Sequence, residues 1–204
     1  MKIYTIRHGQ TDWNLANRVQ GFTDNPLNET GLRQAEQTGE ALKDIPFTKI
    51  YTSPMIRARQ TTAAVRKKLK TQVPVQVCAD IMEQNFGIWE GISRDDPEYQ
   101  KEKHMYFKKF EGGESLLDVS ARIYPFLEQV IRESHDDDVI LISAHGGVSR
   151  MIAGYFNGYD NEQFISYFAK NCEAQMYEVS PELKQHLVEK EKARQAARDM
   201  DAQV

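Results

Sequence analysis

The chain begins MKIYTIRHGQTDWN (residues 1–14), and this stretch decides how the rest of the sequence is interpreted. The apolar and β-prone residues from Ile3 to Ile6 predict a short buried strand over Lys2–Ile6. The strand ends abruptly in Arg7-His8-Gly9, which places a cation and an imidazole directly after it. A hydrophobic core gains nothing from these two side chains, whereas a site that must hold an anion would use both.

The composition is that of a globular domain with a core of its own. The 204 residues are 40% hydrophobic and 27% charged, and the net charge of -4 argues against a nucleic-acid partner. Neither Cys78 nor Cys172 has metal-binding or redox spacing, so we expect free thiols in a reducing compartment. The N-terminal apolar run is too short for a signal peptide, and no run approaches the roughly 18 apolar residues of a membrane span. We therefore expect a cytoplasmic protein without a membrane partner.

Short apolar runs alternate with helical patterns along the chain, which predicts an α/β fold. Such runs are typical of strands buried on both faces. Strands that alternate with helices favour a three-layer α/β/α sandwich with a mostly parallel central sheet. The predicted strands are Lys2–Ile6, Lys49–Thr52, Pro74–Cys78, Asp138–Ser143 and Ala174–Val179.

Two helices are predicted with particular detail. After Thr30, apolar and small residues recur at helical spacing, and after Ser115, which fits an N-cap, a longer apolar stripe follows. Pro125 lies inside that stripe and is expected to kink or shorten the helix. The predicted apolar face of the first helix is Leu32, Ala35, Gly39 and Leu42. That of the second helix is Leu116, Val119, Ile123, Phe126, Leu127 and Val130.

We predict one main domain over residues 1–180. Within it, residues 92–113 include the charged and aromatic stretch Ser93–Phe110, which is expected to form a small lid insertion. Residues 181–204 are rich in Glu, Lys, Arg and Ala and predict a polar C-terminal helix or tail.

Basic residues and histidines follow three of the predicted strands. Arg7 and His8 follow the first, Arg57 lies shortly after the second, and His145 follows the fourth. Because ligands in open α/β sheets bind beyond the carboxyl ends of the strands, these side chains should meet at one edge. Arginines match phosphate oxygens, and an imidazole among them can act as a nucleophile toward phosphorus. Pro54 fits the first turn of a predicted helix, which should also direct its N-terminal amides to this edge.

Transfer of a phosphoryl group to histidine requires a proton for the leaving oxygen. Glu83 comes just after the third predicted strand and should face the same edge. Partial burial beside Phe86 and Trp89, and a nearby phosphate dianion, would favour its protonated form and make it a general acid. Glu90 is the rival and ranks second, because it lies further from the strand end.

These residues fall into motifs that together resemble the histidine phosphatase superfamily, also called phosphoglycerate-mutase-like. The resemblance extends from Lys2 to about Val179, with the motifs in the family's order. They are RHGQTDWN at Arg7–Asn14, QGFTDNPLNETGLRQA at Gln20–Ala35, TSPMIRARQTT at Thr52–Thr62, EQNFGIWEG at Glu83–Gly91, GGES at Gly112–Ser115 and AHGG at Ala144–Gly147.

The resemblance implies a histidine acid-type phosphatase, that is, a phosphoric monoester hydrolase that forms a phosphohistidine and uses neither metal nor cofactor. It implies that His8 is the nucleophile and Glu83 the proton donor, with Arg7, Arg57 and His145 completing the phosphate pocket. It also implies phosphate contacts by Asn14 and the Gly146 amide, and a substrate-facing role for Gln20 and Gly21. The implied partner is a small phosphorylated metabolite, and the sequence leaves a homodimer open.

Three functions remain as alternatives within this resemblance. The sequence His145-Gly146-Gly147 favours the broad-specificity phosphatase branch, because mutases of this type resemble HGN at this place. The short insert that ends in GGES favours the same branch. A 2,3-bisphosphoglycerate-dependent phosphoglycerate mutase is the alternative. A non-catalytic binder of phosphorylated ligands is disfavoured, because the complete set of site residues is present. Lys108-Lys109 could bind a second anionic group of the substrate, whereas Met105, Tyr106, Phe107 and Phe110 could form an apolar wall instead.

Overall fold

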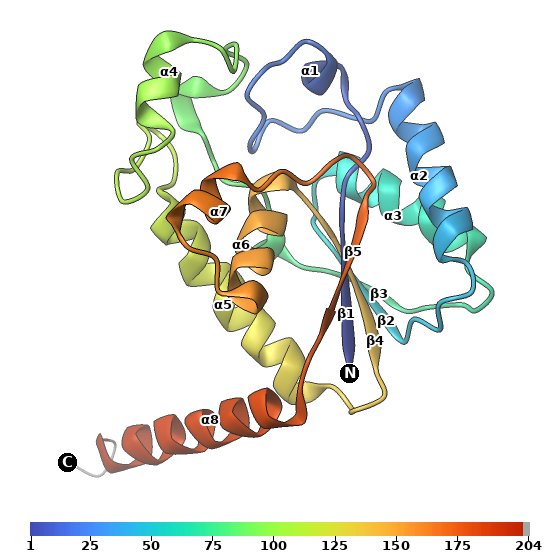
Figure 1. The fold of residues 1–204 in the computed structure, drawn as a ribbon, viewed down its shortest axis with the longest axis vertical. Helices are drawn as coiled ribbons and strands as arrows, with labels where there is room; N and C mark the ends of the chain where they lie inside the picture. The colour runs from blue at the N-terminus through green and yellow to red at the C-terminus, as the bar shows by residue number, and fades with distance from the viewer. Residues whose placement is uncertain (202–204) are drawn as a thin grey trace.

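The computed structural model describes residues 1–201 and shows a five-stranded sheet between two layers of helices (Figure 1). The strand order is β3-β2-β4-β1-β5, in which only β5 is antiparallel to its neighbour. This confirms the predicted α/β sandwich with a mostly parallel sheet. The strands are β1 (Lys2–Arg7), β2 (Lys49–Thr52), β3 (Val75–Val77), β4 (Val139–Ala144) and β5 (Ala174–Glu178).

Helices cover both faces of the sheet. Figure 1 shows α2 and α3 on one side of the strands and α5 and α6 on the other, with α8 extending away from the body. Two short 3-10 turns, Ala79–Ile81 and Gly87–Trp89, follow β3. The helices are α1 (Asp12–Leu15), α2 (Glu29–Leu42), α3 (Ile56–Lys68), α4 (Pro97–Glu102), α5 (Leu116–Glu133), α6 (Gly146–Asn157), α7 (Asn161–Ser166) and α8 (Pro181–Asp201).

The alternation of side chains along the central strands produces two hydrophobic cores. On β4, Ile140 and Ile142 belong to the core under α5 and α6, whereas Leu141 packs with Ile50 and Val65 on the α2–α3 side. Successive strand residues point to opposite faces of a sheet, so one apolar run supplies both cores. This arrangement fixes the sheet and the carboxyl ends of β1, β2 and β4.

The two edge strands differ from the buried strands that the sequence predicted. Val75 and Val77 of β3 are 37% and 55% exposed, and in β5 only Tyr177 is buried. Both strands occupy the edges of the sheet, so each has a neighbour on one side only. A short apolar run therefore predicts a strand correctly, but it does not distinguish a central strand from an edge strand.

Both predicted helices form, and each prediction needs one correction. In α2 the buried face consists of Gly31, Ala35, Gly39 and Leu42, whereas Leu32 is 43% exposed. Ser115 caps α5 through a capping box with Asp118, as the N-cap prediction required.

The helix α5 continues through Pro125 to Glu133, so the predicted shortening is wrong. A proline inside a helix costs about 3 kcal/mol. Burial of Ile123, Phe126 and Leu127, at about 1.5–3 kcal/mol for each side chain, outweighs that cost.

The lid region has a small apolar core separate from the two main cores. Val19, Tyr99 and Phe110 are buried together, and Phe86 and Trp89 pack against them. The predicted boundaries at residues 92, 113 and 180 remain predictions.

At the other end of the chain, α8 is anchored by the buried side chain of Leu187 and by ion pairs from Lys190 and Arg194 to Glu128 of α5. Residues 202–204 of the predicted tail lie outside the described residues. Across residues 1–201, every helix is too short or too polar to cross a membrane.

A close approach between two backbone segments fixes the loop after β1. A Cβ atom at Gly9 would lie 2.4 Å from the Gly31 carbonyl oxygen, and one at Gly31 would lie 2.1 Å from the Gln10 carbonyl oxygen. The Gly9 N–H also donates to Thr61 Oγ1 at 3.0 Å. The N-terminus of α2 thus packs directly against the loop that carries His8.

We predict that Gly31→Ala lowers the free energy of unfolding by at least about 2 kcal/mol, because the new methyl group would collide with backbone rather than with a movable side chain. Urea unfolding would measure the change. Gln37→Ala is the matched control, because Gln37 is exposed on the same helix and its loss should cost less than about 0.5 kcal/mol. Equal stabilities of the two variants would contradict the close-approach argument.

Candidate active site

Five predicted residues meet at the carboxyl edge of the sheet. Arg7, His8, Arg57, Glu83 and His145 are all at most 8% exposed, although they come from four separate segments of the chain. The rings of His8 and His145 lie edge to face with their centroids 5.2 Å apart. The structure therefore brings together the residues that the sequence analysis selected, and their chemical roles remain to be argued.

His8 is held in one tautomer by its own loop. Its Nδ1 lies 2.7 Å from the Gly9 carbonyl oxygen. Because a carbonyl can only accept, Nδ1 carries the proton, and the lone pair is left on Nε2. Burial, followed by the positive charges of Arg57 and Arg7, holds the pKa of His8 well below its ordinary value. His8 is therefore a neutral imidazole with a free nitrogen at neutral pH.

His145 is oriented by a serine that the sequence analysis overlooked. Its Nε2 lies 2.8 Å from Ser53 Oγ, and its Nδ1 is buried without a partner. Ser53 Oγ also accepts the Met55 N–H at 3.4 Å. We assign the serine proton to His145 Nε2, which leaves an N–H at Nδ1 that can donate to an anion. Burial is the main cause that lowers the pKa of His145, with Arg57 second.

Arg57 is completely buried and is bonded to neutral oxygens. It donates to the Gly21 carbonyl at 2.7 Å and to the Thr23 carbonyl at 3.0 Å. With its amide oriented to satisfy both neighbours, Gln20 accepts from Arg57 Nε at 3.0 Å and donates to Thr11 Oγ1. Burial lowers the pKa of Arg57 to about 10, so the side chain stays charged at neutral pH.

Arg7 presents an unused donor at the same place. Its Nη1 donates to the Ala169 carbonyl at 2.9 Å, and its guanidinium lies 5.5 Å from the centre of the Phe168 ring. Its Nε is buried and has no partner. Burial and the nearby charge of Arg94 lower the pKa of Arg7 to about 10. Arg7 and Arg57 together make this part of the site positive.

Glu83 is the carboxylate of this cluster. The Gly147 N–H, in the first turn of α6, lies 3.1 Å from each of its carboxylate oxygens. A Cβ atom at Gly147 would lie 2.5 Å from Glu83 Oε1, so glycine at this position is what allows the contact. The second glycine of the HGG sequence, Gly147, therefore provides both the N–H donor and the space that the Glu83 carboxylate occupies.

Glu90, the rival for the acid role, is engaged elsewhere. Its carboxylate accepts from the backbone N–H groups of Phe22 and Thr23 at 2.7 Å each, and also from the Thr23 hydroxyl. This loop carries the carbonyls that bind Arg57. Glu90 thus supports the loop that holds Arg57, and its carboxylate is already occupied by these hydrogen bonds.

The four predicted binding residues divide into two groups. Gln20 and Gly21 bind Arg57, as described above. The Asn14 Oδ1 accepts the Thr11 N–H at 3.2 Å in the capping box of α1, and Gly146 opens α6 beside Arg7. Direct contacts of Asn14, Gln20, Gly21 and Gly146 with a substrate remain predictions.

The helix terminus at the site is not the one that the sequence predicted. Pro54 lies outside α3, which begins at Ile56, and the Ile56 N–H donates to Asp24 at 2.7 Å. The helix that follows His145 directly, α6, presents its first amides at Glu83 instead. The position of Pro54 was misjudged because Met55 is still extended and serves as the N-cap.

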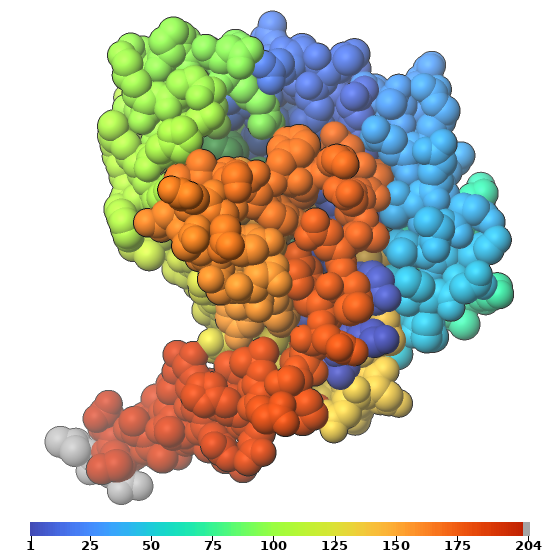
Figure 2. Space-filling view, viewed as in Figure 1, coloured from blue at the N-terminus to red at the C-terminus, as the bar shows by residue number. Residues whose placement is uncertain are grey.

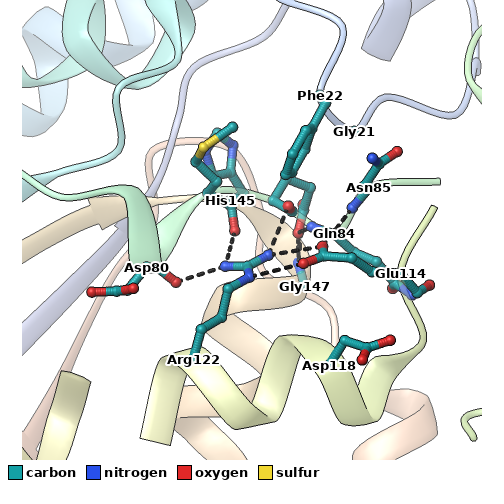
Figure 3. A network of polar contacts seen from close by, with 12 residues as sticks. Gly21, Phe22, Asp80, Gln84, Asn85, Glu114, Asp118, Arg122, His145 and Gly147 are labelled. Atoms are coloured by element: carbon teal, nitrogen blue, oxygen red, sulfur yellow. Dashed lines mark hydrogen bonds and ion pairs between the residues drawn. The ribbon is translucent and has the colours of Figure 1, made fainter. Parts of the chain in front are cut away.

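A second feature that the sequence analysis missed is a network of polar contacts around Arg122 (Figure 3). Arg122 of α5 donates to the backbone carbonyls of Asp80, Met82 and Glu83 at 2.6, 2.7 and 2.9 Å. It also binds both carboxylate oxygens of Glu114, at 3.1 and 3.2 Å. Glu114 of the GGES motif was the signal that the sequence offered, but the sequence does not show that Arg122 is its partner.

A cavity of about 240 Å³ opens at the site. It is lined by Arg7, Glu83 and Gly146, by the lid residues Tyr99 and Tyr106, and by Phe168. In Figure 2 the green atoms of the lid lie beside the orange atoms of the α6–α7 region, and these two parts of the chain supply most of the lining residues. Of the predicted apolar wall, Met105, Tyr106 and Phe110 line the cavity, whereas Phe107 is 83% exposed and does not line it.

Within residues 1–201, no three His, Cys, Asp or Glu side chains are grouped as a metal site would require. The expectation of metal-free chemistry remains a prediction.

Comparison with known proteins agrees with this geometry. The family model of the histidine phosphatase superfamily (branch 1) matches residues 3–189. The chain is 34% identical to "Uncharacterized phosphatase PhoE" of Bacillus subtilis, over 82% of this chain and 83% of the relative. It is 32% identical to "Broad-specificity phosphatase YOR283W" of Saccharomyces cerevisiae, over 92% and 84%. It is also 31% identical to a 2,3-bisphosphoglycerate-dependent phosphoglycerate mutase of Allorhizobium ampelinum, over 79% and 82%.

Solved structures share the fold. YhfR of Bacillus stearothermophilus superimposes with a TM-score of 0.77 at 26% identity, covering 88% of this chain and 92% of that one. A mycobacterial glucosyl-3-phosphoglycerate phosphatase superimposes with a TM-score of 0.75 at 25% identity, covering 86% and 91%.

We predict that the unliganded protein loses stability as the pH falls from 7 to 5. The pKa values of His8 and His145 are lowered in the folded state, so below about pH 6.5 the unfolded chain binds protons that the folded chain does not. Each histidine should reduce the free energy of unfolding by up to about 1.4 kcal/mol per pH unit in this range.

Urea unfolding at pH 7, 6 and 5 would measure this slope. His8→Asn should make the slope shallower, whereas His186→Asn, which alters an exposed residue of α8, should leave it unchanged. A wild-type slope retained in His8→Asn would show that His8 is not buried in its neutral form.

Proposed function

This chain belongs to the histidine phosphatase superfamily, branch 1, and we propose that it hydrolyses phosphate monoesters of small molecules through a phosphohistidine on His8. The observation that carries the proposal is the state of His8. Its Nδ1 is engaged by a backbone carbonyl, and its pKa is lowered by burial and by the adjacent arginines. A neutral imidazole beside two cations is suited to attack a phosphate dianion, which the cations attract and orient.

In the first step, His8 Nε2 would attack phosphorus in line with the ester oxygen. A bond from nitrogen to phosphorus forms while the bond from phosphorus to the ester oxygen breaks. Protonated Glu83 would donate its proton to that oxygen, so the alcohol leaves neutral. Arg7, Arg57 and the His145 Nδ1–H would bind the three remaining oxygens, whose charge is redistributed in the transition state.

In the second step, water would attack the phosphohistidine. Glu83, now a carboxylate, would accept a proton from the water as the new oxygen–phosphorus bond forms. The electron pair of the nitrogen–phosphorus bond returns to His8 Nε2, and inorganic phosphate leaves. One carboxyl group can serve both steps because Gly147 holds it in the same place throughout.

The phosphatase is preferred to the mutase because of the surroundings of Glu83. The absence of a side chain at position 147 leaves the carboxylate at the border of an open cavity, which water can enter. A mutase must instead protect its phosphohistidine from water. Relatives with both names match this chain at similar identity, so only the reaction can distinguish the two.

We expect the wild-type protein to release inorganic phosphate from a panel of phosphate monoesters, and His8→Ala to lose that activity because the nucleophile is gone. One incubation with 3-phosphoglycerate, followed for both free phosphate and 2-phosphoglycerate, would separate hydrolysis from isomerisation. Isomerisation without phosphate release would identify a mutase. Loss of activity in EDTA that a divalent cation restores would contradict the metal-free mechanism.

We also predict that Arg122→Gln mimics a weak form of Glu83→Gln. Both variants should lose more activity on alkyl phosphates, whose leaving groups need a proton, than on 4-nitrophenyl phosphate. The expected loss on alkyl phosphates is roughly 10²–10⁴-fold for Glu83→Gln and roughly 10-fold for Arg122→Gln, which only displaces the acid.

The matched control is Arg132→Gln, because Arg132 also lies on α5 but is within 4.0 Å of Glu191. Its ratio of alkyl to nitrophenyl hydrolysis should equal that of the wild type. Equal losses of Arg122→Gln on both substrates would mean that Arg122 supports the fold and does not position Glu83.

A further inference from the structure

The cavity contains more positive charge than one phosphate group requires. Arg7 at the cavity wall, together with the nearby Arg57, would balance a phosphate dianion, but Arg94, Lys103, Lys108 and Arg150 also line the cavity. Glu83 is the one carboxylate among the described lining residues, and it is already assigned to proton transfer. Because Lys108 is paired with Glu102, three further cations remain around a single bound phosphate.

Arg150 is the best placed of the three. It lies on α6, donates to the Tyr167 carbonyl at 3.1 Å, and has its guanidinium 5.7 Å from the centre of the Phe164 ring. Its Nε is buried and has no hydrogen-bond partner. A neutral carbonyl and an aromatic face orient this charge without cancelling it, and its unused donor carries a desolvation cost.

A second unused donor comes from the lid. The hydroxyl of Tyr106 is buried without a partner, and its ring packs edge to face against Phe164 with centroids 6.0 Å apart. The Tyr106 backbone is fixed as well, since its carbonyl accepts the Leu116 N–H at 3.0 Å. Tyr106 and Arg150 thus pack on the same phenyl ring from different elements, and both line the cavity.

The lysines that the sequence suggested for this purpose are neutralised. Lys108 forms an ion pair with Glu102, and Lys109 lies 3.2 Å from Asp118. Both lysines are also largely exposed, so their interaction with a ligand would be screened by water.

The surroundings of Arg150 are electropositive. Burial, Lys103 and Arg150 together lower the pKa of the neighbouring His104. Arg94 is held in place by the Arg18 carbonyl at 3.1 Å. The positive charge therefore comes from side chains of the lid and of α6, and backbone carbonyls hold Arg94 and Arg150 in place.

We propose that Arg150 and Tyr106 form a second anion subsite, which binds a carboxylate or a second phosphate on the same substrate molecule. This proposal rests on the proposed function for the role of the first phosphate. The preferred substrates are then small phosphate monoesters that carry a further negative group, with Arg94 and Lys103 contributing attraction at longer range.

Binding tests the subsite independently of turnover. The probes are ω-carboxyalkylphosphonates with two to five methylene groups, each compared with the alkylphosphonate of equal chain length, by titration calorimetry. The series allows for the unknown separation between the two anionic groups. We expect at least one carboxylate probe to bind about 10-fold or more tightly than its alkyl match, since a charge-assisted hydrogen bond is worth about that much.

Two variants should reduce this preference. Arg150→Gln should abolish it, and Tyr106→Phe, which keeps the ring and removes the hydroxyl, should weaken it several-fold. Lys109→Gln is the matched control, because it removes an ion-paired cation of the same lid, and it should retain the wild-type preference. A preference that is absent in the wild type, or unchanged in Arg150→Gln, would overturn the proposal.

Kinetics then separates this proposal from the proposed function. Hydrolysis of 3-phosphoglycerate and of glycerol phosphate should differ in kcat/KM, and the ratio should fall in Arg150→Gln. Hydrolysis with equal kcat/KM for both substrates would contradict the subsite alone. A binding preference that depends on Arg150, without hydrolysis of any ester by the wild type, would support the subsite and contradict the phosphatase.

Discussion

The burial of Arg7 and Arg57 against neutral oxygens is the interaction on which the site depends. Taking a guanidinium out of water costs several kcal/mol even after relaxation, and carbonyl oxygens recover only part of this cost. The loop of Gly21–Thr23, the Ala169 carbonyl and the Gln20 amide are all arranged to hold these two charges. These hydrogen bonds to neutral acceptors hold both charges without cancelling them, which is what the proposed phosphate binding requires.

The field of these two charges sets the states of the other reactive groups. It helps to keep the pKa of His8 low, so His8 is neutral where a free histidine would be partly protonated near its ordinary pKa. The Glu83 carboxylate accepts the Gly147 N–H, and the Glu83 backbone carbonyl accepts from Arg122. The two arginines, His8 and Glu83 are therefore one electrostatic arrangement. Its supports extend into α5, α6 and the loop of Glu90.

In our proposal, the lid contributes to selectivity. Its Tyr99 and Phe110 pack with Val19, Phe86 and Trp89 in a separate apolar cluster, and its Tyr106 packs against Phe164 of α7. Side chains on such an insertion can change without disturbing the sheet, because the two main cores lie below it. We interpret the main domain as the source of reactivity, and Arg150 of α6 together with Tyr106 of the lid as the source of substrate preference.

The sequence by itself determined the five strands, the parallel class of the sheet and the convergence of Arg7, His8, Arg57, Glu83 and His145. These follow from local periodicity and from the rule that parallel strands end at one edge. It could not determine that β3 is exposed, that α5 continues through Pro125, that Glu90 is structural, or that Ser53 and Arg122 orient site residues. Each of these depends on which distant segment packs against the residue. Local sequence pattern predicts where strands and helices lie along the chain. Hydrogen-bond partners and burial depend on contacts between distant segments, which exist only after the chain has folded.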